Sequence, residues 1–306
     1  MTLVRRKVVF HFIKALFVKQ RKRKNGVSVK DYYNECAEKE FLRTHKDAAH
    51  LLEFQTTEHI YKKYLKKGMK ILDAGGGPGR YTINLAKQGY HMTLLDISDK
   101  ELELARKKIK QYRVDKFVDS VDLGSITELP YKDNSFDMVL CIGGPLSHLR
   151  TEADRKKAIK ELVRVAKPGT PIFISVMARP SVLHLSVKDF KKYISTYAFK
   201  KEQEFWKEMD ILTKQGDDNW WCKISYAHFF WPSELKDLVL KTAKNTKLLH
   251  QVALEWPNQN LKDEFNEIAK NKRYYKEWLK LHFAVCEHPD MLSLSAHIMI
   301  VIQKKK

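Results

Sequence analysis

The stretch KILDAGGGPGRYTINLAKQGYHMTLLDIS, residues 70–98, holds four glycines within five positions: Gly75, Gly76, Gly77 and Gly79. One carboxylate, Asp73, precedes this cluster, and a second one, Asp96, lies near the end of the stretch. Glycine loses more backbone entropy on folding than any other residue, so four glycines this close together require a structural reason. A turn that adopts positive φ, or that a ligand approaches closely, is such a reason.

The pattern around the glycines alternates short apolar runs with amphipathic segments. Residues 69–74 and 91–96 are apolar runs of the kind that form buried parallel strands. The segment RYTINLAKQ predicts a helix that ends before Gly89, and SDKELELARKKIKQY predicts a second helix with Ser98 as its N-cap. The stretch therefore predicts a strand, a helix, a strand and a helix.

The same alternation continues along the chain. FVDSVD (residues 117–122), FDMVLCIG (136–143) and PIFISV (171–176) predict strands three to five, and EADRKKAIKELVRVAK (152–167) predicts a helix that Pro168 ends. Residues 27–65 have helical periodicity, residues 232–244 predict a further helix, and residues 294–303 predict a final strand. This order predicts an α/β fold: a Rossmann-like, doubly wound, mostly parallel sheet with helices on both faces.

The domain boundaries follow from the interruptions of this rhythm. We expect a basic N-terminal helical arm over residues 1–30 and one domain over residues 31–306. Within that domain, residues 60–177 form the core, residues 178–227 form a lid-like insertion after strand five, and residues 228–306 complete the sheet. The insertion is assigned because it is rich in lysine and aromatic side chains, among them Trp220 and Trp221.

Composition and charge limit the classes of protein. Hydrophobic residues make up 43% and charged residues 31%, the balance of a soluble globular protein. The four cysteines form no C-x-x-C pair, so we expect neither a metal site nor a disulfide framework, and a cytoplasmic location. The net charge is +20, and ten lysines and arginines precede the first acidic residue, Asp31. Such a basic arm can bind RNA or an anionic membrane surface. Alternatively, it is a solvated extension without a partner.

The glycine spacing distinguishes between cofactors. The dinucleotide fingerprint is G-x-G-x-x-G, whereas here the spacing is D-x-G-x-G-x-G, with Arg80 where a third dinucleotide glycine would lie. An acid at the end of the strand repels a pyrophosphate but can orient an ammonium group. The segment LDAGGGPGRY resembles motif I of the class I S-adenosylmethionine (SAM) dependent methyltransferases. The resemblance continues through LLDIS, GSITELPYKDNSFDMVLCIGGPLSHL and ELVRVAKPGTPIFIS, and it covers roughly residues 30–180.

This resemblance implies SAM as the cofactor and a role for each matching residue. The glycines would pass beneath the methionine part of SAM, Asp73 would organise its amino group, and Asp96 would accept both ribose hydroxyls. Ser125 would accept from the adenine amino group, and Ile126 would pack on the adenine face. The full set of expected cofactor residues is Asp73, Ala74, Gly75, Gly76, Gly77, Gly79, Asp96, Ile97, Ser125, Ile126, Ile142 and Gly143.

Methyl transfer requires a base only when the acceptor must lose a proton. His148 is the titratable group in CIGGPLSHL, the segment that follows strand four, so it is a candidate general base, with helix capping as the alternative. Tyr32 and Tyr33 resemble an aromatic pair on a first helix that closes over SAM in relatives. We therefore expect a methyltransferase acting on an unidentified, small-molecule acceptor. An RNA methyltransferase and a non-catalytic SAM-binding regulatory protein are the alternatives.

Overall fold

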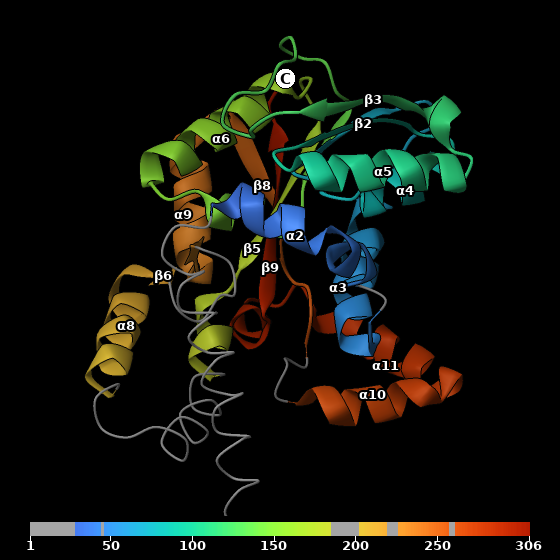
Figure 1. The fold of residues 1–306 in the computed structure, drawn as a ribbon. Helices are drawn as coiled ribbons and strands as arrows, with labels where there is room; N and C mark the ends of the chain where they lie inside the picture. The colour runs from blue at the N-terminus through green and yellow to red at the C-terminus, as the bar shows by residue number, and fades with distance from the viewer. Residues whose placement is uncertain (1–27, 44–45, 185–201, 219–225, 257–260) are drawn as a thin grey trace, which may run out of the picture.

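The computed structural model describes residues 28–43, 46–184, 202–218, 226–256 and 261–306. A seven-stranded sheet in the order β3-β2-β1-β4-β5-β9-β8 forms the centre of the described structure (Figure 1). Its first five strands are parallel, and β9 runs antiparallel to both of its neighbours. The strands are β1 (Lys70–Ala74), β2 (His91–Asp96), β3 (Val118–Leu123), β4 (Met138–Cys141), β5 (Pro171–Met177), β8 (Thr246–Ala253) and β9 (His297–Lys304). The expected doubly wound, mostly parallel sheet is confirmed.

The strand order reverses between β1 and β4. From β1 the chain builds outward through β2 to β3, and then returns to add β4 and β5 on the other side of β1. In open parallel sheets, ligands bind outside the carboxyl ends of the strands at such a reversal. The turn that follows β1 contains the glycine cluster, so the topology places that cluster at the expected ligand site.

Helices cover both faces of the sheet. On one face lie α3 (Ala48–Tyr61), α4 (Arg80–Ala86) and α5 (Asp99–Gln111), and on the other lie α6 (Glu152–Val165) and α9 (Pro232–Thr242) (Figure 1). Neighbouring residues of a strand point to opposite faces, so β1 contributes Ile71 to one apolar core and Leu72 to the other. Ser98 is the N-cap of α5, as predicted: its side chain accepts from the Glu101 N–H.

The N-terminal helical region divides in two. Helix α2 (Val29–Leu42) is capped by Ser28, and α3 begins after Asp47, whose side chain accepts from the His50 N–H. A new N-cap starts a new helix because it satisfies otherwise unpaired N–H groups. Helix α2 buries no side chain completely, and in Figure 1 it is drawn in front of the sheet.

The C-terminal region holds elements that the pattern analysis did not assign. Strand β8 extends the sheet, and α10 (Lys262–Lys270) and α11 (Lys272–Val285) separate it from β9. Leu52 of α3 packs with Phe265 of α10, and Trp278 of α11 packs against them. Through this cluster, α10 and α11 pack against α3 in the N-terminal half of the chain.

The insertion after β5 is described in part. It contains α8 (Glu202–Gln215) and a hairpin of β6 (Asp217–Asp218) and β7 (Ala227–His228). Trp220 and Trp221, much of the insertion and residues 1–27 of the arm lie outside the described residues, so the lid and the arm stay predictions. Among the helices in the described ranges, none is long and apolar enough to cross a membrane.

Candidate cofactor site

The turn between β1 and α4 requires glycine because of its own protein neighbours. Gly75 has φ +75°, and a Cβ there would lie 2.6 Å from Pro145 Cγ. A Cβ on Gly76 would lie 2.4 Å from Asp73 Cγ. Non-bonded carbon atoms essentially never lie this close, so no larger side chain fits without a shift of the turn or of these neighbours. The glycines therefore let the turn pass between the carboxylate below it and the segment after β4.

The amide groups of this turn are used inside the protein. The Gly75 and Gly76 N–H groups donate to the Leu95 carbonyl, at 2.7 and 3.2 Å. The Gly77 N–H donates to Asp96 Oδ2 at 2.9 Å, and the Gly79 N–H donates to the Gly76 carbonyl at 3.0 Å. Proline has no N–H, so residues 75–79 offer no free backbone donor. A phosphate-binding loop needs such donors, so this turn is unsuited to a pyrophosphate.

Asp96 lies at the end of β2 with both oxygens oriented by the backbone. Its Oδ2 accepts from the Gly77 N–H, and its Oδ1 accepts from the Ser98 N–H at 2.8 Å. Burial raises the pKa of this carboxyl, while the backbone donors lower it. Each oxygen keeps a lone pair after these bonds, so Asp96 can still accept two hydroxyl groups.

Asp73 lies beneath the turn. Its Oδ2 accepts from Thr82 N–H at 3.1 Å and from Thr82 Oγ1 at 2.7 Å, while its Oδ1 is buried and has no partner among the described residues. Burial raises the pKa of Asp73 to about 6. Asp73 is not among the residues that line the pocket described next. Its expected role toward the amino group of the cofactor stays a prediction.

One pocket lies at the carboxyl ends of β1 to β4. It encloses about 860 Å³ of empty space, a volume that includes open solvent at its mouth. Ten of the thirteen predicted site residues line it: Gly75, Gly76, Gly77, Asp96, Ile97, Ser125, Ile126, Ile142, Gly143 and His148. Asp73, Ala74 and Gly79 do not. Residues predicted from four separate segments thus lie around one cavity.

The same pocket contains charged residues that the sequence did not single out. Glu40 of α2 accepts from Arg80 twice, at its carbonyl oxygen (2.6 Å) and at Oε1 (3.1 Å). Arg43 Nε also donates to Glu40 Oε1, at 2.8 Å. In the sequence, Arg80 only marks a departure from the dinucleotide pattern. Its contact with Glu40, forty residues earlier in the chain, is a tertiary contact that local spacing does not reveal.

Glu101 is the third charged residue that the pattern missed. Its position three residues after Ser98 matches a capping box, a local signal that explains a glutamate without reference to a ligand. The structure instead places the carboxylate in the pocket, where a Cβ on Gly77 would lie 2.8 Å from Glu101 Oε2. Burial, together with the charges of Asp96 and Glu40, raises the pKa of Glu101 to about 9.

His148 has both ring nitrogens engaged. Its Nδ1 lies 3.1 Å from the Tyr226 carbonyl and its Nε2 lies 3.0 Å from the Tyr33 hydroxyl. Because a carbonyl only accepts, Nδ1 carries the proton and Nε2 accepts from Tyr33. Burial lowers the pKa of His148 to about 4, which keeps the ring neutral. The helix that follows is capped by Thr151 and not by His148.

The comparisons with known proteins agree with this geometry. Residues 71–169 match the family model described as a methyltransferase domain. The chain is 38% identical over 117 residues to norajmaline N-methyltransferase of Rauvolfia serpentina, covering 38% of each chain. It is 32% identical over 138 residues to the ubiquinone/menaquinone biosynthesis C-methyltransferase UbiE of Psychromonas ingrahamii, covering 44% of this chain and 51% of UbiE. The chain thus spans about half or less of the length of these curated relatives.

Solved structures show the same fold. A SAM-dependent methyltransferase from Methanosarcina mazei superposes with a TM-score of 0.55 and 19% identity, covering 80% of this chain and 97% of that one. The CcbJ methyltransferase of Streptomyces caelestis superposes with a TM-score of 0.57 and 11% identity, covering 92% and 100%. The fold and the sequence match define a class I methyltransferase domain. The resemblance of this domain to the class I methyltransferases, whose cofactor is SAM, is thus confirmed.

Proposed function

We propose that this chain transfers the methyl group of SAM to a small organic acceptor. The observation that carries the proposal is the convergence of the glycine turn, Asp96 and the Tyr33–His148 pair on one pocket. The pocket lies where the strand order reverses, the position at which open parallel sheets bind ligands.

The residues of the pocket fit the cofactor. When bound, SAM supplies a methyl group on a sulfonium that is already activated for transfer. The turn has no free amide for a phosphate, whereas Asp96 and Glu40 place carboxylates around the cavity and suit a cationic ligand. Asp96 keeps two lone pairs for the ribose hydroxyls. Ile126 and Ile142 give the adenine side an apolar wall.

In this proposal the Tyr33–His148 pair, which lines the pocket, lies on the acceptor side. Because His148 Nε2 accepts from Tyr33, the tyrosine oxygen is oriented and can in turn accept a hydrogen bond from an N–H or O–H of the acceptor. A histidine with a pKa near 4 is a weak base at neutral pH, so we assign His148 the positioning of Tyr33 rather than proton removal. Most of the acceleration then comes from in-line orientation and the exclusion of water.

The relatives' names support an acceptor of small-molecule size. One is named for N-methylation of norajmaline and the other for C-methylation in ubiquinone and menaquinone biosynthesis. The two names differ in the atom that receives the methyl group. The proposal therefore extends to the class of acceptor and not to the acceptor atom.

The test uses purified full-length protein, SAM with an isotopically labelled methyl group and a cell extract separated into metabolite and RNA fractions. The proposal predicts a labelled small molecule, and we expect Tyr33→Phe and His148→Gln to lower its rate of formation by roughly 10–100-fold, because the acceptor is then less well oriented. Asp119→Ala, on the exposed edge strand β3, serves as the control and keeps the rate. Label in RNA alone would show an RNA methyltransferase. SAM binding without label in either fraction would show a non-catalytic SAM-binding protein.

A further inference from the structure

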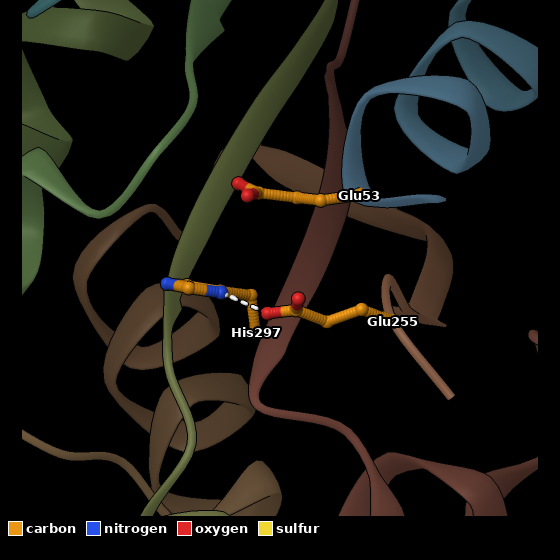
Figure 2. Close-up of side chains that lie close together, drawn as sticks. All are labelled: Glu53, Glu255 and His297. Atoms are coloured by element: carbon orange, nitrogen blue, oxygen red, sulfur yellow. Dashed lines mark hydrogen bonds and ion pairs between the residues drawn. The ribbon is translucent and has the colours of Figure 1, made fainter. Parts of the chain in front are cut away.

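Three side chains with metal-binding groups converge outside the cofactor pocket (Figure 2). Glu53 extends from α3, Glu255 follows β8, and His297 is the first residue of β9. One ligand atom from each of the three lies within 4.8 Å of the other two. We propose that these side chains bind a divalent transition-metal ion, with Zn²⁺ or Mn²⁺ as the matching chemistry. This site goes beyond the proposed methyl transfer and does not depend on it.

The strongest observation is a buried carboxylate oxygen without a partner. Glu53 is 1% exposed, and its Oε2 accepts from Arg43 at 2.6 Å. Its Oε1 is fully buried and has no hydrogen-bond partner among the described residues. An unsatisfied buried charged atom is costly, so the oxygen needs a positive or donating partner. Figure 2 shows the Glu53 carboxylate reaching across toward the His297 ring.

The other two ligands are held by the backbone of β8 and β9. The Leu254 N–H donates to the His297 carbonyl at 3.0 Å, which keeps the end of β8 beside the start of β9. The Glu255 N–H donates to Ser295 Oγ at 3.0 Å, and that hydroxyl donates to the His297 carbonyl at 2.6 Å. Ligands whose positions are fixed by surrounding hydrogen bonds lose little entropy on binding a metal.

In the metal-free arrangement, His297 Nδ1 hydrogen-bonds to Glu255 Oε1 (Figure 2). In the proposed complex the cation lies between His297 Nδ1 and Glu255 Oε1 and replaces the proton that these two atoms share. That proton is released to solvent. Glu53 Oε1 then gains a cation as its partner, while Glu53 Oε2 keeps Arg43. The two carboxylates and one imidazole remain as ligands, and water completes the coordination.

The set of ligands selects the kind of metal. Mg²⁺ and Ca²⁺ prefer oxygen ligands alone, whereas an imidazole nitrogen with carboxylates suits Zn²⁺ and Mn²⁺. The His297 side chain is 17% exposed, so the ion has access from solvent on that side. No cysteine of the described residues belongs to this cluster, so the cysteine spacing did not predict the site.

A metal here would join segments that are far apart in the sequence. The ligands come from residues 53, 255 and 297, and they connect the N-terminal helix α3 to the last two strands of the sheet. A ligand that binds the folded state and not the unfolded one stabilises the fold. Zn²⁺ is therefore expected to raise the midpoint of thermal unfolding in proportion to the logarithm of its concentration.

The experiment measures Zn²⁺ binding to untagged, full-length protein that has been dialysed against EDTA and then freed of EDTA. Calorimetric titration with ZnCl₂ should show one saturable site, and Co²⁺ should give the absorption bands of a site containing nitrogen and oxygen ligands. Glu53→Gln and His297→Gln should each weaken Zn²⁺ binding at least 10-fold, as loss of a direct ligand exceeds the usual effect of a supporting residue. Mg²⁺ should not compete.

A matched pair elsewhere in the chain provides the control. His250 of β8 hydrogen-bonds Glu287 and Tyr64 but belongs to no group of three metal-binding side chains among the described residues, so His250→Gln should leave Zn²⁺ binding unchanged. Glu255→Gln can still accept from His297, and it replaces His297→Gln if that variant does not fold. The proposal is overturned if no saturable Zn²⁺ binding occurs. It is equally overturned if Glu53→Gln and His297→Gln bind Zn²⁺ as tightly as the wild type.

Discussion

At the scale of single residues, the glycine turn shows that a sequence can predict which residue type a position needs without revealing the reason for it. The sequence indicates that residues 75–79 need glycine, and it predicts that a ligand is the reason. The structure shows that Asp73 and Pro145 already require glycine at positions 76 and 75, through contacts that would be 2.4 and 2.6 Å from a Cβ. The atoms that exclude a side chain at these positions belong to the protein itself, and only the three-dimensional structure shows that they lie there. The cofactor approaches a turn whose shape is fixed beforehand.

Asp96 is the residue whose substitution tests the ribose position most directly. Asp96→Ala removes a partly desolvated carboxylate, so we expect SAM affinity to fall by about 2–4 kcal/mol. Asp96→Asn keeps one acceptor oxygen, so it should lower the affinity for SAM less than Asp96→Ala does. Isothermal titration calorimetry measures both. Asp119→Ala is the matched control on a neighbouring strand, and unchanged affinity in Asp96→Ala would show that the ribose lies elsewhere.

Glu101 gives a prediction on pH. Its pKa of about 9 in the folded protein lies above the ordinary value of 4.5. Between these values the folded state holds a proton that the unfolded state has lost, so stability is full below pH 4.5 and falls as the pH rises toward 9. Glu101→Gln carries no titrating proton and removes this slope.

The measurement is urea unfolding of both proteins at pH 5 and pH 8. From pH 5 to pH 8, the free energy of unfolding of Glu101→Gln should rise by on the order of 2–4 kcal/mol relative to that of the wild type. Glu103→Gln, an exposed substitution on the same helix, is the control, since the Glu103 side chain is 70% exposed. An equal stability difference at pH 5 and pH 8 would mean that Glu101 is ionised in the folded protein.

At the scale of elements, local signals predicted the first five strands, the helices between them and the Ser98 cap, because each depends on near neighbours in the chain. The sequence does not predict strand β8, because four consecutive residues of its eight are each only partly buried. Such a strand lacks the alternation of apolar and polar residues that identifies a strand. Helices α10 and α11 are amphipathic, but they interrupt the alternation of strand and helix on which the predicted fold rests. Glu40 and Arg80 meet only through the packing of α2, which no local pattern encodes.

Helix α2 is held over the pocket mainly by polar contacts. Arg80 bonds both the carbonyl and the carboxylate of Glu40, and Arg80 is largely buried, whereas the Lys30–Asp99 pair is exposed. We expect Arg80→Gln to speed amide hydrogen exchange in α2 and to weaken SAM binding, because the helix loses its contact with the turn. Lys30→Gln should change neither, since exposed ion pairs contribute little. Equal exchange in both variants would contradict this account of α2.

At the scale of the whole molecule, charge is distributed unevenly. The chain carries +20, yet the pocket is lined by the carboxylates of Asp96 and Glu40, with Arg80 bound to Glu40, and by Glu101, whose raised pKa keeps it protonated at neutral pH. A continuous set of ion pairs then leads from Arg80 through Glu40 and Arg43 to Glu53, the buried ligand of the proposed metal site. The cofactor pocket and the end of β9 are thus connected through the N-terminal helices.

The central claim is that this pocket binds SAM. Calorimetric titration of the full-length protein with SAM, S-adenosylhomocysteine and NAD tests it most directly. The account predicts saturable binding of SAM and S-adenosylhomocysteine, weakened in Asp96→Ala, and no binding of NAD, because the turn offers no free amide to a pyrophosphate. Saturable binding of NAD without binding of SAM would contradict it.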